Sequence, residues 1–442
     1  MTDPSNLIDR QKADEIAERL DMHGIGRRQF LKVLGATVGA AAAGNILAAC
    51  GGGGGGSASA ASDGKVAIIN FSLVGDYSVE WNEGAAAAAK QLGMSSTSFD
   101  GKGDATTQQN EFNQALTKGI DGVFILAVDG GLVKTMAESA NQNEMYFSAA
   151  WANEPWFTPW DSGPWYSQFL IDDEVTGIAD ACELLFKAMG EEGTVVRLSG
   201  FGPEDATEIV RLAGFKKALA KYPKIKLAGE LPGEYEPAAS QKATAALLTR
   251  YPETTGVVGI NDDATTGAVA AIEAAGKVPG KDIFVTGANG SVEGVKRIAA
   301  GTQVSTTGNV PSYPSYVITA NFFDRLNGFK MNEAERMFGW NAVILQKSNV
   351  QPYLDRYVTG PVDKQFSAKL LSRIESPKNW DWQFEAFPWE NLEELFPEVP
   401  KPSGYQYPAA YLKAKEDGSF KKVREEWKEH YKIPVLGPSP LS

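Results

Sequence analysis

The chain has 442 residues, with 42 lysines and arginines against 55 aspartates and glutamates, and its formal net charge at pH 7 is −13. An acidic chain of this kind is a poor candidate for binding nucleic acid or anionic lipid headgroups. Its length is sufficient for two domains with hydrophobic cores of their own.

The N-terminal segment reads as an export signal. Arg27 and Arg28 precede an apolar run, Val33–Ala49, that ends at Cys50. The run is too short and too rich in glycine and alanine for a permanent span, which needs about 20 strongly apolar residues. The arginine pair resembles the twin-arginine signals that export folded proteins, and the residues before Cys50 resemble a lipobox, whose cysteine is acylated and becomes the new N-terminus. The alternative is a short membrane anchor with a chance cysteine.

We therefore expect a signal peptide over 1–49, followed over 50–64 by a lipid-bearing cysteine and a flexible Gly/Ser tether. This predicts a protein in the periplasm or at the cell surface, anchored by its lipid to the outer face of the cytoplasmic membrane. If Cys50 carries lipid, Cys182 has no partner for an intramolecular disulfide.

Catalytic and metal-binding motifs are scarce. After cleavage only one histidine, His430, would remain, which excludes a histidine-pair zinc site. Neither a Gly-x-Ser-x-Gly elbow nor a Gly-x4-Gly-Lys-Ser/Thr phosphate loop occurs. We therefore expect no catalytic residues, no metal and no cofactor.

From Lys65 onward, short apolar runs alternate with helical segments, which predicts parallel sheets covered on both faces. The expected strands are Val66–Phe71, Met94–Phe99, Val123–Leu126, Met145–Ala149, Gln168–Ile171, Thr194–Ser199, Ile225–Leu231, Gly256–Ile260, Ile283–Thr286 and Gln303–Thr307. The expected helices are Glu80–Leu92, Thr106–Lys118, Leu132–Asn141, Val175–Met189, Ala206–Tyr222, Pro237–Arg250, Ala264–Ala275, Val292–Ala300 and Ser315–Asn327. Two consecutive sets of such units predict an α/β protein with two doubly wound lobes.

Ligands of such sheets bind beyond the carboxyl ends of the strands. The residues at those positions are rich in amides and aromatic rings and poor in groups that titrate near neutral pH, which is typical of a binding cleft. They are Ser72–Tyr77, Ala127–Asp129, Ala150–Asn153, Phe201–Asp205, Asn261–Asp263, Ala288–Asn289 and Asn309.

Several motifs occur in the order and at the spacing of the ribose-type, sugar-binding periplasmic proteins of ABC transporters, which the stretch Lys65 to about Val358 resembles. They are Gly119–Leu126, Arg211-Leu212-Ala213-Gly214-Phe215, Gly259-Ile260-Asn261-Asp262, Gly287-Ala288-Asn289-Gly290, Gly308-Asn309-Val310-Pro311 and Ser348–Tyr353. The resemblance implies the type I fold of two lobes joined by a three-strand hinge. It places lobe 1 at 65–171 with 311–330, and lobe 2 at 172–309 with the hinge return 331–358, including a last strand near Trp340–Leu345.

The resemblance also implies the residues that hold the solute. Lobe 1 would contribute Tyr77 and Trp151. Lobe 2 and its crossing would contribute Arg211, Tyr235, Asn261, Asn289 and Asn309. These residues offer donors, acceptors and ring faces to a sugar. The alternative for each asparagine is a turn or a helix cap.

The chain also departs from the family pattern. Trp151-Ala152-Asn153 stands where the family usually has Asp-Arg, Asn289 stands where it has Asp, and the asparagine expected after the third strand is Leu126 or Ala127. Because a buried guanidinium needs an acceptor, Arg211 raises two hypotheses. Either the solute is anionic or partly aromatic, or Glu208, Asp262 or Glu234 neutralises Arg211 and the solute is a neutral sugar or polyol.

Two aromatic segments remain. Trp151–Tyr166 contains four tryptophans and no period; apart from Trp151, we interpret it as an inserted loop packed on its own side chains rather than a lid. The extension 359–442 carries two apolar helical faces, expected to pack on the lobes rather than to dock a partner. Their residues are Trp389, Leu392, Leu395 and Phe396, and then Phe420, Val423, Trp427 and Tyr431.

Together these features predict an extracytoplasmic solute-binding protein of an ABC importer. Its partners would be a sugar, polyol or sugar acid, the ABC permease and, through the lipid, the membrane, but not nucleic acid. A binding protein that signals to a chemoreceptor or sensor kinase is the first alternative, and an exported enzyme on a similar scaffold is the second.

Overall fold

The computed structural model describes residues 64–441 except 75, 203–204 and 397–398. All of them belong to one compact unit, 61–442. The predicted signal residues Arg27 and Arg28, the lipidation residue Cys50 and the tether up to residue 63 lie outside the described residues.

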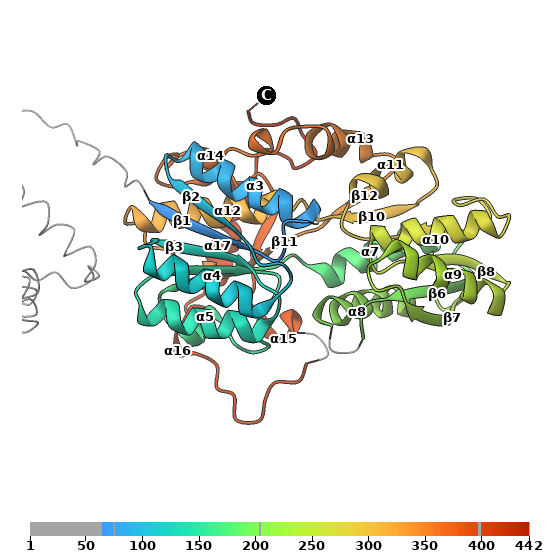
Figure 1. The fold of residues 1–442 in the computed structure, drawn as a ribbon, viewed down its shortest axis with the longest axis horizontal. Helices are drawn as coiled ribbons and strands as arrows, with labels where there is room; N and C mark the ends of the chain where they lie inside the picture. The colour runs from blue at the N-terminus through green and yellow to red at the C-terminus, as the bar shows by residue number, and fades with distance from the viewer. Residues whose placement is uncertain (1–63, 75, 203–204, 397–398, 442) are drawn as a thin grey trace, which may run out of the picture. The chain divides into compact units, whose positions relative to one another are not determined.

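Two sheets organise the described chain (Figure 1). The first has seven strands in the order β13-β11-β5-β4-β3-β1-β2, all parallel except β13, which runs antiparallel to β11. Its strands are β1 Lys65–Asn70, β2 Ser95–Asp100, β3 Gly122–Leu126, β4 Tyr146–Ala150, β5 Tyr166–Leu170, β11 Met337–Trp340 and β13 Ala386–Pro388.

The second sheet has six strands in the order β12-β10-β9-β8-β6-β7, all parallel except β12, which is antiparallel to β10. They are β6 Gly193–Ser199, β7 Ile225–Pro232, β8 Thr254–Val258, β9 Phe284–Thr286, β10 Ser305–Gly308 and β12 Val343–Gln346. The predicted α/β fold with two doubly wound lobes is confirmed.

Helices cover both faces of each sheet, as the continuous apolar runs of the central strands require. Around the first sheet lie α3 Asp76–Gln91, α4 Ala105–Thr117, α5 Gly130–Gln142 and α12 Ser312–Leu326. Around the second lie α7 Glu174–Ala188, α8 Ala206–Lys221, α9 Pro237–Arg250, α10 Asp262–Ala274 and α11 Val292–Ala300. The remaining helices are α6 Pro159–Ser162, η2 Glu333–Glu335, α13 Val350–Tyr353, η3 Leu354–Val358, η4 Val362–Lys364, α14 Ala368–Leu371, α15 Leu392–Leu395, α16 Ala409–Glu416 and α17 Ser419–Glu429.

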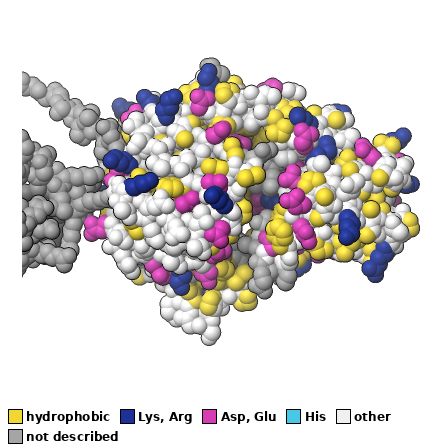
Figure 2. Space-filling model, viewed as in Figure 1, with side chains coloured by type: hydrophobic (Ala, Val, Ile, Leu, Met, Phe, Trp, Pro, Cys, Tyr) yellow, Lys and Arg dark blue, Asp and Glu magenta, His cyan; other side chains and the backbone are white. Residues whose placement is uncertain are grey.

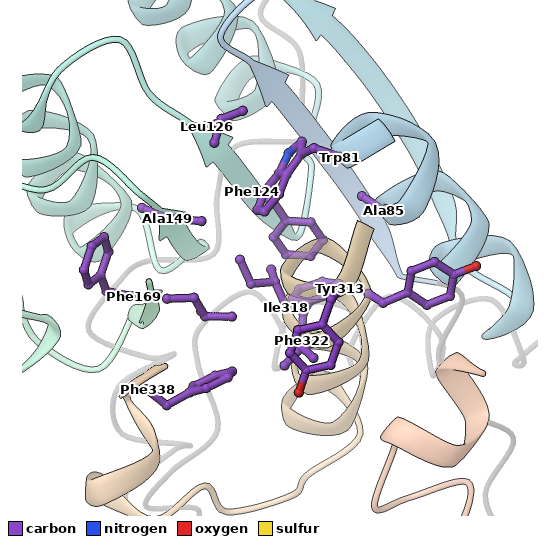
Figure 3. Close-up of a cluster of buried hydrophobic side chains, with 14 of the residues drawn as sticks. Trp81, Ala85, Phe124, Leu126, Ala149, Phe169, Tyr313, Ile318, Phe322 and Phe338 are labelled. Atoms are coloured by element: carbon purple, nitrogen blue, oxygen red, sulfur yellow. The ribbon is translucent and has the colours of Figure 1, made fainter. Parts of the chain in front are cut away.

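Several helices begin where a side chain supplies an acceptor for their first free N–H groups. Asp104 accepts from Thr107 N at the start of α4, and Asp129 accepts from Leu132 N at the start of α5. Close approach is built in as well: a Cβ on Gly122 would lie 2.5 Å from the Phe322 ring, so this glycine lets α12 pack directly on β3. Figure 3 shows the resulting core, with side chains from β3, β5, β11 and α12: Phe124, Phe169, Phe338, Ile318 and Phe322.

The chain passes between the two sheets four times: after β5, after β10, between β11 and β12, and between β12 and β13. The strand expected near Trp340–Leu345 is therefore two strands, one in each sheet. The assignment of 331–358 to lobe 2 needs a correction, because Met337–Trp340 pairs with β5 of the first sheet whereas Val343–Gln346 pairs with β10 of the second. The two-residue step over Asn341 and Ala342 is too short to show as a break in apolar pattern.

The extension packs on lobe 1, as expected. Its strand β13 adds a seventh strand beside β11, and Trp427 of α17 is buried with its ring centroid 5.4 Å from Phe338 and 4.5 Å from Trp382. The loop 151–166 packs differently from the expectation. Instead of contacting only its own side chains, it rests on the extension: the Trp156 indole donates to Val399 O at 3.1 Å, and the Trp160 ring lies 5.1 Å from Tyr411.

Within the described ranges, no helix combines the length and the hydropathy that crossing a bilayer requires.

The position of Trp427 predicts that the extension stabilises lobe 1. Replacing it by alanine leaves a cavity between Phe338 and Trp382, so Trp427→Ala should lower the free energy of unfolding by about 3–5 kcal/mol in urea denaturation followed by circular dichroism. Lys421→Ala, on an exposed face of the same helix, is the control and should change it by less than about 0.5 kcal/mol. Equal effects of the two substitutions would show that the extension is not part of the lobe 1 core.

Candidate functional site

A buried ion pair lies at the start of the second lobe. The Arg211 guanidinium on α8 donates to both carboxylate oxygens of Glu174 on α7, with Nε–Oε2 at 2.9 Å and Nη2–Oε1 at 3.0 Å. It donates further to Ile260 O at 2.6 Å and to Asn289 Oδ1 at 2.7 Å. Burial alone would lower the pKa of Arg211, but the charge and hydrogen bonds of Glu174 raise it above its ordinary value.

The partner of Arg211 differs from both hypotheses raised by the sequence. Arg211 does not need Glu208, Asp262, Glu234 or a solute as its acceptor, because Glu174 on the preceding helix α7 supplies a bidentate carboxylate. Glu208 is instead paired with Arg197 at 2.6 and 2.8 Å, and Asp262 accepts from Gln303, Ser291 and Thr306. Arg211 therefore does not require an anionic solute as its acceptor.

The three predicted asparagines lie at the carboxyl ends of strands in the second sheet. Asn289 and Asn309 join the ion pair: Asn289 accepts from Arg211, and Asn309 Nδ2 donates to Glu174 Oε1 at 3.1 Å. Asn261 accepts from Ala264 N at 2.8 Å, so its carbonyl caps α10, which was the alternative considered for it. The backbone carbonyl beside it, that of Ile260, still binds Arg211.

Tyr235 is coupled to the same region. Its hydroxyl donates to Asp205 Oδ2 at 2.6 Å, and its ring lies 5.2 Å from Phe201, a residue that is 74% exposed. Burial, and then the hydrogen bond to Asp205, raise the pKa of Tyr235, while the charge of Arg211 opposes that rise.

The first lobe contributes an aromatic cluster. Trp151 directly follows β4. Its ring centroid lies 5.7 Å from that of Tyr77 and 6.1 Å from that of Trp340, and both contacts are edge to face. Trp340 is the last residue of β11 and is fully buried. Trp340 is not among the site residues predicted from the sequence, because the expected strand near Trp340–Leu345 begins with it. Nothing in that pattern marks Trp340 as the last residue of a strand, which it is in the structure.

Three of the predicted site residues have strained backbones. The φ angles are 68° at Trp151, 57° at Tyr235 and 94° at Asn289, in the left-handed region that non-glycine residues rarely adopt. Val310, directly after Asn309, has a φ of 39° although it is β-branched. Such strain concentrates at functional positions, where the surrounding structure holds it.

Asp172 is a further candidate site residue, which the sequence marks only as the predicted start of lobe 2. It follows β5, is 2% exposed, and neither carboxylate oxygen has a hydrogen-bond partner in the described chain. Burial, followed by the charge of Glu174, raises the pKa of Asp172 well above its ordinary value, while Arg211 opposes the rise. Asn309 Oδ1 and the indole nitrogens of Trp151 and Trp340 are also buried without a partner.

Strand ends of both sheets thus place polar atoms and ring faces at the lobe crossings. Among the described residues, no group of histidine, cysteine, aspartate and glutamate side chains could hold a metal ion. On the face drawn in Figure 2, acidic and basic side chains are interspersed. The arrangement suits the binding of a small polar molecule.

The sequence profile described as "Periplasmic binding protein domain" matches residues 66–328. The chain belongs to this family. Ribose import binding protein RbsB of Escherichia coli (strain K12) is 25% identical over 249 residues, covering 56% of this chain and 79% of that protein. The xylitol-binding protein of Mycolicibacterium smegmatis (strain ATCC 700084 / mc(2)155) is 26% identical over 248 residues, covering 56% of this chain and 68% of that protein.

Solved structures of this fold family also superpose on the chain. The twin-arginine translocation pathway signal protein from Burkholderia phytofirmans has a TM-score of 0.61 and 25% sequence identity, and the match covers 68% of this chain and 95% of that chain. The profile match ends at residue 328, so the strands β11, β12 and β13 and the extension lie beyond it.

The buried ion pair yields a stability prediction. Glu174→Gln leaves the Arg211 guanidinium without a carboxylate, so the free energy of unfolding should fall by about 3–5 kcal/mol in urea denaturation. Glu183→Gln on the same helix is the matched control. Glu183 pairs with Lys221 and Lys187, whose side chains are 54% exposed, so this substitution should cost less than about 1 kcal/mol. Equal losses in the two variants would contradict the importance assigned to the pair.

Proposed function

We propose that this protein is the extracytoplasmic solute-binding protein of an ABC importer and that it binds a sugar or polyol between its two lobes, without catalysing a reaction. The observation that carries the proposal is the convergence of strand-end residues at the crossings. Trp151 and Trp340 from the first sheet and Asn289 and Asn309 from the second bring ring faces and amides to the segments that join the lobes.

These groups match the chemistry of a sugar. Aromatic rings pack on the apolar face of a sugar ring, while amides both donate to and accept from hydroxyls. The relatives named for ribose import and for xylitol binding support this class of solute. The mechanism is a population shift, in which a solute that contacts both lobes favours the closed arrangement and so presents a defined surface to the permease.

The proposed site yields a binding prediction. Wild-type protein should bind at least one of D-ribose, D-allose and xylitol in isothermal titration calorimetry, and Trp151→Ala should weaken that binding by about 10–100-fold because the ring face is lost. Trp156→Phe is the control: this residue is in the same loop but packs on the extension, so binding should be unchanged. Binding of none of these solutes, or equal effects of the two substitutions, would contradict the site.

We further propose that Arg27 and Arg28 direct export of the folded protein and that Cys50 carries lipid, which anchors the chain to the outer face of the cytoplasmic membrane. The order of arginine pair, apolar run and cysteine supports this, as does the likeness to a protein described as a twin-arginine translocation pathway signal protein.

The anchor can be tested by metabolic labelling. Cells fed radiolabelled palmitate should label the wild-type protein and Cys182→Ala, but not Cys50→Ala, since Cys182 is free and buried. Replacing both Arg27 and Arg28 by lysine should leave the unprocessed protein in the cytoplasm. Label in the Cys50→Ala variant would exclude Cys50 as the lipid site.

A further inference from the structure

We infer that Asp172 is the specificity-determining residue of the proposed solute site: its carboxylate accepts two hydroxyl hydrogens of the solute, and it restricts the solute to polyhydroxy compounds that have adjacent hydroxyls and no carboxylate. This inference rests on the proposed function and refines the class of solute.

The position of Asp172 follows from three neighbouring strands. In the first sheet β5 lies between β4 and β11, and all three are parallel, so their carboxyl ends share one edge. Two backbone hydrogen bonds fix the register there: Trp151 N donates to Leu170 O at 3.1 Å, and Asp173 N donates to Trp340 O at 3.1 Å. Asp172 therefore stands between the two tryptophans, on the segment that crosses to the second lobe.

Among the described residues, the carboxylate of Asp172 accepts no hydrogen bond, in contrast to the carboxylates of its two neighbours. Asp173 caps α7 by accepting from Thr176 N at 3.0 Å, and Glu174 neutralises Arg211. Asp172 is as buried as Glu174, yet both its oxygens lack a donor. A buried carboxylate without hydrogen-bond donors is unfavourable. Hydroxyl groups of a bound solute would supply donors to the two carboxylate oxygens of Asp172.

The surrounding unpartnered atoms define the rest of the solute. Asn309 Oδ1 is a second acceptor, because Asn309 Nδ2 is already bound to Glu174. Within the described part of the chain, the indole N–H of Trp340 is a buried donor without a partner, and the indole N–H of Trp151 has only the Tyr77 phenol beside it. Hydroxyl groups both donate and accept, so a polyol or sugar can satisfy acceptors and donors together.

A carboxylate on the solute would find neither an acceptor that it can donate to nor, in the described part of the site, a free cation. It has no hydrogen to donate to Asp172, and the nearby cation is already engaged, since Arg211 makes four hydrogen bonds with its five N–H groups. The net charge of Asp172, Glu174 and Arg211 is negative when all three are ionised. The site should therefore disfavour a sugar acid.

Binding should also release a proton. Burial and Glu174 raise the pKa of Asp172, and its charged surroundings are Asp173 and Glu174 on its own segment, Arg211 on α8, and the Tyr77 phenol on α3. Hydroxyl donors favour the ionised carboxylate and lower the pKa on binding. Affinity should therefore rise with pH until it reaches the raised pKa of the unbound protein, and become constant above it.

The test compares Asp172→Asn with Asp173→Asn by calorimetry, using D-ribose, xylitol, D-ribonate and 1-amino-1-deoxy-D-ribitol. We expect wild-type protein to bind a neutral probe at least tenfold more tightly than D-ribonate. Asp172→Asn should weaken the neutral probe at least tenfold and abolish the pH dependence of its affinity. Asp173→Asn should change affinity less than twofold, because asparagine also caps helices. The melting temperature of Asp172→Asn should be equal to or above that of the wild type, which a merely structural aspartate would not give.

The outcomes separate the inference from the proposed function. If a neutral probe binds wild type and Asp172→Asn equally, Asp172 is not the specificity residue and the proposed function stands. Preference for D-ribonate over the neutral probes overturns the exclusion of sugar acids. If neither D-allose nor any of the four probes binds wild-type protein, the proposed function and this inference both fail.

Discussion

The bidentate pair between Arg211 and Glu174 is the interaction on which the rest of the proposed site depends. It joins α7, the first element after a lobe crossing, to α8, and through Asn289 and Asn309 it holds the ends of two further strands. Because a guanidinium and a carboxylate this deeply buried tolerate little displacement, they fix the relative positions of four segments of lobe 2. Because Arg211 and Glu174 neutralise each other, Arg211 does not also neutralise Asp172. The pair therefore influences which solute the proposed site accepts.

The first lobe holds large aromatic rings at the ends of its strands. Trp340 and Trp151 meet edge to face, and the extension supports them from behind: the Trp389 indole donates to Ile171 O at 3.2 Å, and Asn341 N donates to Glu385 O at 3.0 Å. Residues beyond the family profile thus bind directly to the first and third lobe crossings. The extension is part of the frame of the site rather than an appendage.

Local pattern was sufficient for much of this architecture. Helices at 237–250 and 292–300 have the expected ends, because proline or serine starts each one and the apolar spacing is regular. The partner of Arg211 was beyond such reasoning. Glu174 is 37 residues away, and its approach depends on how α7 packs against α8, whereas the candidates considered were acids near the family motifs. Asp172 and Trp340 could not be identified as site residues from the sequence. They approach Trp151 only because β4, β5 and β11 are neighbours in the first sheet.

The central claim is that a neutral polyhydroxy solute is held at the lobe crossings by Asp172, Asn309 and the tryptophan pair. A crystal structure of the full chain grown with xylitol or D-ribose tests it most directly. The account predicts two solute hydroxyls within hydrogen-bond distance of the Asp172 carboxylate, about 2.5–3.0 Å, and another on Asn309 Oδ1. Solute bound elsewhere, or bound here with the Asp172 oxygens still lacking donors, would contradict it.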